Sequence, residues 1–167
     1  MPADSDGEDP WASYERTVVE IAGPGGGSLR VGSAPEADEA GWPWPTAEPV
    51  HILTAWDPGP ERPGPDLNRR RQAALEADLS SLAVPLWAAV GVDPVTGRRE
   101  EGVAVQGAAE PVILALAARY GQDAIFAWTP EEWAIVSCLG GRRQASGWAL
   151  VAHRPGFPFS RAPDAPI

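Results

Sequence analysis

The sequence has no lysine, one cysteine and only two histidines, and each scarcity narrows the possible chemistry. All thirteen basic residues are arginine, so Schiff bases, phosphate-loop lysines and cofactor aldimines have no amine to use. Cys138 has no second cysteine for a disulfide or a structural zinc site, and His51 and His153 lack the paired spacing of metal ligands. We expect a protein of the reducing cytoplasm with no cofactor and no metal.

Long apolar runs and basic clusters are also missing. No apolar run approaches the roughly 20 residues of a membrane helix, and the acidic residues 1–10 do not resemble a secretory signal. The net charge is -10; residues 1–48 hold ten acidic residues and two arginines, and residues 49–154 hold twelve and ten. Nucleic-acid binding normally needs a basic surface, so we expect neither a nucleic-acid nor a membrane partner.

The length of 167 residues, with 44% hydrophobic residues, suits one domain. We predict a mobile acidic tail over 1–13, a single α+β domain over 14–153 with its organised core from residue 50, and a proline-rich C-terminal tail over 154–167. The segment 34–49 is polar and interrupted by prolines, which predicts a surface loop. Its Trp42 and Trp44 either pack back on the domain, which we favour, or stand exposed as anchors for a protein partner.

Apolar runs and helical spacing define the regular elements. Strands are predicted at 17–21, 28–32, 50–56, 86–92, 102–106, 123–128, 132–138 and 148–153. Leu75, Leu79 and Leu82 recur at the helical interval, with Asp66 as the expected N-cap and Pro85 beyond the end. A second helix is predicted between Pro111 and Gly121.

From residue 50 the predicted order is strand, helix, strand, strand, helix, strand. This order is typical of the split βαβ unit, in which both helices cover one face of an antiparallel sheet. We therefore predict an α+β two-layer sandwich with a ferredoxin-like βαββαβ core. Additional antiparallel strands, among them the hairpin over 17–32, should extend its edges. Other two-layer sheets share the same order and remain alternatives.

Polar residues at the start of the first helix share a face with its leucines. Counting back from Leu75 by four and by seven gives Arg71 and Asn68. Trp56 and Asp57 end the preceding strand and should lie near this helix start. A guanidinium beside the positive end of a helix suits a phosphate or a carboxylate. The alternative is structural, with Asp57 paired to Arg71 and Asn68 capping a loop carbonyl.

Other polar residues extend this site. Gln122 follows the stop of the second helix and enters a strand, so it either lines the same pocket or bonds a neighbouring loop. We predict ligand binding by Trp56, Asp57, Asn68, Arg71 and Gln122. Glu100 and Glu101 open a strand, where one carboxylate should point inward. Asp57 and Glu101 are the candidate general bases if the protein is an enzyme.

Several short motifs together resemble a bacterial family known as domain of unknown function 3293. The motifs are Thr54-Ala55-Trp56-Asp57-Pro58, Asn68 with Leu75, Glu100-Glu101-Gly102, and Tyr120-Gly121-Gln122-Asp123-Ala124-Ile125, within residues 14–138. The family pattern has Asn-Pro where this chain has Asp57-Pro58, and an Asn where Arg71 stands. The resemblance implies no activity, and it draws attention to Asp57, Asn68 and Gln122.

These observations favour a non-catalytic binding or regulatory domain for a small anionic ligand or an acidic partner segment. One alternative is an enzyme acting on a phosphate- or carboxylate-bearing small molecule. Another is an interaction module that uses Trp42 and Trp44.

Overall fold

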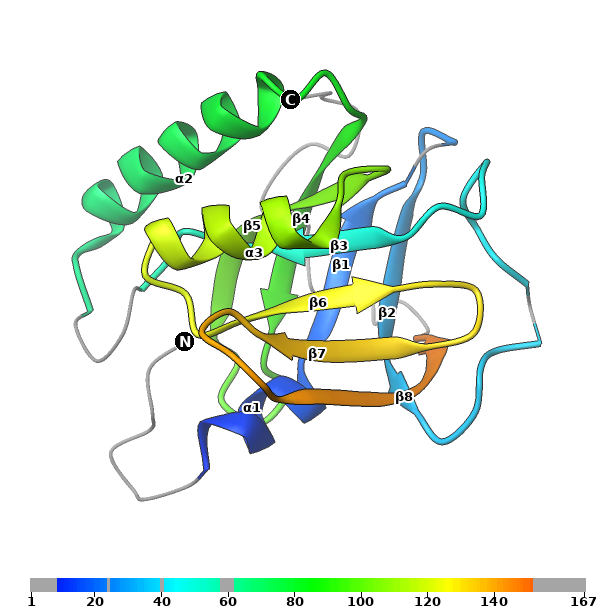
Figure 1. Cartoon of the computed structure of the whole chain (residues 1–167). Coiled ribbons are helices and arrows are strands. Elements are labelled where there is room, and N and C mark those ends of the chain that lie inside the picture. Colours follow the sequence, from blue (N-terminus) through cyan, green and yellow to red (C-terminus); the bar gives the residue numbers. More distant parts are fainter. Residues whose placement is uncertain (1–8, 24, 40, 58–61, 152–167) are drawn as a thin grey trace.

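A computed structural model of the chain describes residues 9–23, 25–39, 41–57 and 62–151 (Figure 1). Within these residues it has three helices, α1 Pro10–Arg16, α2 Pro65–Ser80 and α3 Glu110–Arg119. Its eight strands are β1 Val18–Ala22, β2 Ser28–Ala34, β3 Val50–Leu53, β4 Leu86–Val92, β5 Arg99–Gln106, β6 Ala124–Trp128, β7 Trp133–Ser137 and β8 Arg143–Leu150. No helix among the described residues has the length and apolar character needed to cross a bilayer.

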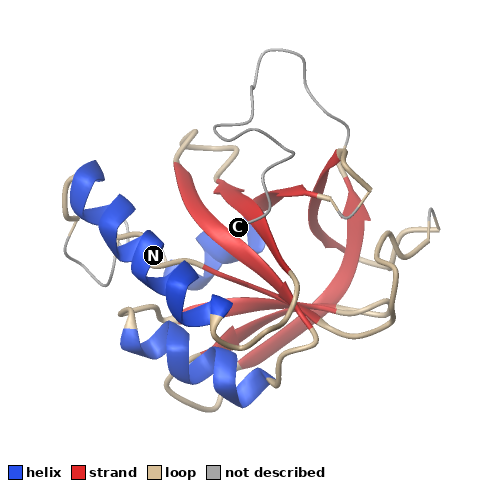
Figure 2. Ribbon diagram, turned by 90° about the horizontal axis from the view of Figure 1, so that it is seen from above, coloured by secondary structure: helices blue, strands red, loops and turns tan. Residues whose placement is uncertain are grey.

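The strands form one closed antiparallel barrel. Their order is β1-β2-β8-β7-β6-β3-β5-β4, and β4 pairs again with β1. The pair β1–β4 sets Val19 opposite Gly91, and the pair β2–β8 sets Val31 opposite Leu150. Figure 2 shows α2 and α3 together on one side of the strands.

The predicted ferredoxin-like two-layer sandwich is therefore wrong. The order of elements from residue 50 is as predicted, and the four strands involved lie side by side as β6-β3-β5-β4. The predicted sheet edges do not exist, because β1 pairs with β4 while β7 and β8 continue the sheet from β6 to β2. Closure depends on strand tilt and on pairing between distant segments, and local sequence patterns report neither.

The long helix begins two residues earlier than the sequence predicted. Gly64 is its N-cap and Pro65 its first residue, so Asp66 lies in the first turn and is not the N-cap. Proline suits this position, because the first helical N–H groups have no partner inside the helix. At the end of α3, Gly121 adopts a φ of 77°, which a glycine does without steric cost, and this confirms the predicted stop.

Alternation along the strands divides the apolar residues into two cores. On β5, Val103 and Val105 face outward to α2 and α3, whereas Ala104 faces the barrel interior. Leu75, Leu79, Ile113 and Ala117 supply the helical side of the outer core. The inner core occupies part of the barrel interior, so strands such as β3 and β5 bury apolar residues on both faces.

Tryptophans fill much of the inner core. Trp44 is 5% exposed, and Trp42 is half-buried. The ring of Trp42 lies 5.1 Å from that of Trp128, and the ring of Trp44 lies 4.7 Å from that of Trp87. The prediction that these two residues pack back on the domain is confirmed.

Helix α1 was not predicted from the sequence. Asp9 caps it by accepting from the backbone N–H of Trp11, and Trp11 and Tyr14 are buried against Ile135. Arg16 binds Asp93 through Nε and Nη2 at 2.9 to 3.1 Å. Most of both predicted tails, together with His153, falls outside the described residues, so the predicted domain limits remain predictions.

Candidate functional site

Asp57 and Asn68, two of the predicted site residues, are in direct contact where the chain leaves β3. They are 7% and 3% exposed. The backbone N–H of Asp57 donates to Asn68 Oδ1 at 3.0 Å, and Asn68 Nδ2 donates to Asp57 Oδ1 at 2.9 Å. The start of α2 therefore faces the end of β3, as the helical spacing predicted.

Side chains also hold the peptide groups of the segment after β3. At Ala55, the backbone N–H donates to the Gln72 side chain and the carbonyl accepts from Arg71. At Trp56, the backbone N–H donates to the Thr54 hydroxyl and the carbonyl accepts from the Gln122 side chain. Buried backbone groups need such partners when no neighbouring strand supplies them. Arg71 and Gln122, two of the predicted residues, thus hold this connection together with Gln72 and Thr54. Direct contact of the predicted residues with a ligand stays a prediction.

Arg71 is engaged by backbone carbonyls. Its Nε donates to Ala55 O at 3.3 Å and its Nη2 to Tyr120 O at 2.6 Å. The carboxylate of Asp57 binds Arg98 and not Arg71, so the proposed Asp57–Arg71 pair is wrong. These bonds use two of the five N–H donors of the guanidinium and direct Arg71 toward the backbone.

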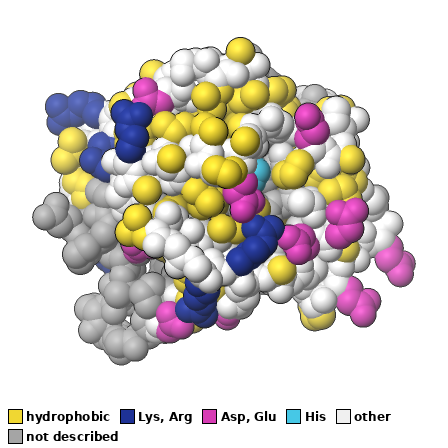
Figure 3. Space-filling model, viewed as in Figure 1, with side chains coloured by type: hydrophobic (Ala, Val, Ile, Leu, Met, Phe, Trp, Pro, Cys, Tyr) yellow, Lys and Arg dark blue, Asp and Glu magenta, His cyan; other side chains and the backbone are white. Residues whose placement is uncertain are grey.

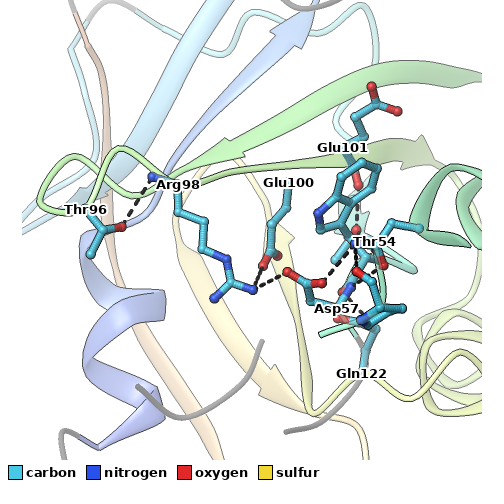
Figure 4. A network of polar contacts seen from close by, with 10 residues as sticks. Thr54, Asp57, Thr96, Arg98, Glu100, Glu101 and Gln122 are labelled. Atoms are coloured by element: carbon cyan, nitrogen blue, oxygen red, sulfur yellow. Dashed lines mark hydrogen bonds and ion pairs between the residues drawn. The ribbon is translucent and has the colours of Figure 1, made fainter. Parts of the chain in front are cut away.

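Two carboxylates share one guanidinium at this end of the barrel (Figure 4). Arg98 Nη2 contacts Asp57 Oδ2 and lies 2.9 Å from Glu100 Oε1. Asp57 also has a φ of 45°, an unusual value that Asp tolerates better than most residues. Backbone held in such a conformation is common near binding and catalytic sites.

Of the two glutamates that open β5, Glu100 is the inward one. It is 6% exposed, whereas Glu101 is half-buried and uses its backbone carbonyl to accept from Thr54. Burial raises the pKa of Glu100, and the charge of Asp57 raises it further, while Arg98 and Arg62 lower it. Glu100 is thus the carboxylate whose surroundings suit proton transfer or a strong hydrogen bond.

A pocket extends from Glu100 into the barrel. The space in which the centre of a water-sized molecule can lie is about 40 Å³, and the pocket is partly open to solvent. Three inward strand positions carry small residues, Ala89, Gly91 and Gly102, which leaves room that larger side chains would fill. Val19, Ile52, Ile125 and Phe126 complete a mainly apolar wall.

Helix α1 brings Tyr14 to the same pocket. Tyr14 is 4% exposed, and its hydroxyl has no hydrogen-bond partner among the described residues. Burial, followed by the negative charges of Asp123 and Glu100, raises the pKa of this hydroxyl. Tyr14 therefore stays protonated at neutral pH and can donate a hydrogen bond.

Other chemically reactive groups lie outside the pocket. Cys138 is half-buried, and burial, with the charge of Asp123, raises its pKa to about 11, so the unreactive thiol dominates. His51 is 2% exposed, and its Nε2 lies 3.0 Å from Glu110 Oε2. Within the described part of the chain, no three His, Cys, Asp or Glu residues gather as metal ligands.

Glu100, Arg98 and Tyr14 were not among the predicted ligand-binding or catalytic residues. Strand alternation indicated that one of Glu100 and Glu101 points inward, but did not say which. Tyr14 had no signal, because α1 was not predicted and a single aromatic residue reveals neither its helix nor its orientation.

Part of the chain matches a known protein family. Residues 53–125 match the family model described as protein of unknown function (DUF3293), which confirms the resemblance over this segment. No curated protein and no solved structure matches the chain. The matched segment contains Asp57, Asn68, Arg98, Glu100 and Gln122, whereas Tyr14 lies before it.

Proposed function

We propose that this chain, with its DUF3293 segment, is a binding domain that takes a small, mainly apolar molecule into the end of its barrel. The pocket beside Glu100 carries the proposal, because small residues on β4 and β5 keep the interior open there. Eight-stranded barrels have an interior that either is filled by side chains or holds one small ligand. Here tryptophans fill one part and the pocket occupies another.

The contacts favour this ligand over the anionic one predicted from the sequence. Arg71 is held by two carbonyls, and the charged groups nearest the pocket include the carboxylates of Asp57 and Glu100. Carboxylates repel an anion. In Figure 3 the basic side chains on the visible face occur in small groups beside acidic ones, with no extended basic surface.

A thermal-shift screen with apolar fragments tests the binding proposal. A ligand at a hundred times its dissociation constant stabilises a protein by about 2.7 kcal/mol. The screen is repeated on Gly91→Ala, which adds a methyl group to the pocket wall. Gly32→Ala is the matched control, because Gly32 also lies in a strand with room for a Cβ but faces away from the interior.

If fragments bind in the pocket, they should raise the unfolding temperature of the parent and of Gly32→Ala. The same fragments should raise the unfolding temperature of Gly91→Ala by less. A screen without hits, or hits that both variants retain equally, would contradict the proposal.

A second candidate function is acid–base catalysis, favoured by the buried Glu100 and the buried Tyr14, which line the same pocket. Fragments that bind are incubated with the protein, and their conversion is followed by mass spectrometry. Glu100→Gln should abolish conversion, whereas Glu101→Gln, on the opposite face of β5, should retain it. Unchanged fragments would leave binding as the function.

The interaction module remains a weaker proposal. Trp44 is almost fully buried, and Trp42 donates from its indole N–H to Thr46 O. Their packing leaves little aromatic surface for a partner protein.

A further inference from the structure

The polar groups on the pocket wall differ in what they still have to offer a ligand. Thr17 Oγ1 donates to Ser13 O at 2.7 Å, and Thr54 Oγ1 donates to Glu101 O. The amide of Gln122 donates to Trp56 O at 3.0 Å. Each of these three side chains therefore already donates a hydrogen bond to a backbone carbonyl of the protein.

Tyr14 and Glu100 retain capacity. Within the described residues, neither the Tyr14 hydroxyl nor Glu100 Oε1 has a hydrogen-bond partner, and both atoms are buried. Arg98 lies 2.9 Å from Glu100 Oε1 as an ion pair, without the alignment of a hydrogen bond. The pocket thus has one protonated hydroxyl that can donate and one carboxylate oxygen that can accept. A buried polar atom without a partner is costly, so a ligand that supplies both partners gains affinity.

We infer that the pocket recognises a neutral hydroxyl group on a single-ring apolar molecule, which donates to Glu100 and accepts from Tyr14. This inference rests on the proposed function, because it names the ligand class of the same pocket. A hydroxyl group has one donor and two acceptor lone pairs, so its chemistry matches a carboxylate oxygen that accepts and a tyrosine hydroxyl that donates.

Charge also favours a neutral group. The two carboxylates oppose an anion, while Arg98 already compensates part of their charge. A cation would have to leave water for a pocket with mainly apolar walls, which is costly. The desolvation of a hydroxyl costs less, and two hydrogen bonds offset it.

Four probes of similar size separate these chemistries: phenol, toluene, benzoate and benzylamine. Their dissociation constants are measured by ligand-observed NMR on the parent, Tyr14→Phe, Glu100→Gln and Tyr120→Phe. Tyr120→Phe is the control, because it removes a tyrosine hydroxyl that donates to Asp78, outside the pocket. Phenol should bind the parent about fivefold more tightly than toluene, as one or two hydrogen bonds allow.

Tyr14→Phe should raise the dissociation constant of phenol about fivefold and leave that of toluene unchanged. Tyr120→Phe should change neither dissociation constant. Glu100→Gln should also weaken phenol relative to toluene. Equal binding of phenol and toluene to the parent overturns the hydroxyl inference but supports the pocket. Tightest binding by benzylamine or benzoate overturns it in favour of a charged ligand. If none of the four binds, both the inference and the proposed function fail.

Discussion

Asn68 and Asp57 are joined by two hydrogen bonds that run in opposite directions, so the first turn of α2 is fastened to the end of β3. Asn68 Nδ2 also donates to Pro63 O at 3.3 Å. One buried amide thus fixes the backbone and the carboxylate of Asp57, and with them the guanidinium of Arg98 beside Glu100.

Asn68→Ala should therefore destabilise the protein strongly. It leaves the N–H and carboxylate of Asp57 buried with fewer partners, which should lower the free energy of unfolding by about 2 to 4 kcal/mol. Urea denaturation measures this loss. Arg69→Ala is the control on the same helix, because Arg69 is exposed and its pair with Asp66 lies at the surface, so its cost should stay below about 0.5 kcal/mol. Equal losses in the free energy of unfolding for the two variants would contradict a stabilising role of the Asn68–Asp57 hydrogen bonds.

Gly91→Ala should raise stability. A Cβ at Gly91 meets only Thr17 Cγ2 at 3.6 Å and Glu100 O at 4.0 Å, which are ordinary contacts. Replacing a strand glycine by alanine then stabilises by about 0.5 to 1 kcal/mol. Gly147→Ala should do the opposite, because a Cβ there would overlap the backbone of Glu36. Thermal unfolding of both variants checks the contrast, and a loss of stability in Gly91→Ala would show that the pocket wall has no such room.

Glu100→Gln should have an effect on stability that depends on pH. The folded protein raises the pKa of Glu100 above the unfolded value of 4.5, so the folded state binds more protons and loses stability as pH rises past that value. Glutamine does not titrate. The variant should gain stability relative to the parent between pH 4.5 and pH 8, as measured by urea denaturation. A constant difference in stability between variant and parent across this range would show that folding does not raise the pKa of Glu100.

Asp93→Asn should have the opposite dependence. Its hydrogen bond with Arg16 lowers the pKa of Asp93 from 3.8 to about 2, so the stabilisation is present above pH 3.8 and is lost as pH falls toward 2. The variant should be about 1 to 2 kcal/mol less stable than the parent at pH 7, with a smaller difference in acid. Asp66→Asn, an exposed carboxylate, should show little change at either pH. A difference that does not shrink below pH 3.8 would contradict the role of the Arg16 pair.

The sequence predicted local structure and the vicinity of the site better than the overall fold. Continuous apolar runs located most strands. Helical spacing placed Asn68 toward Asp57, because Asn68 lies on the same helix face as Leu75 and Asp57 lies just before that helix. Barrel closure depends on pairs such as Val19 with Gly91, which no local pattern reports. The roles of Glu100 and Tyr14 depend on the same closure, since only the closed wall and α1 bring them to one pocket.

Because strands distant in sequence close the barrel, closure also limits how far the chain can be truncated for expression. The matched segment 53–125 contains β4 and β5 whole, but it includes only Leu53 of β3 and two residues of β6, and it lacks β1, β2, β7 and β8. A fragment limited to it would expose strand edges that pair with other chains. The matched segment is thus smaller than the barrel, and expression of this protein should keep the strands on both sides.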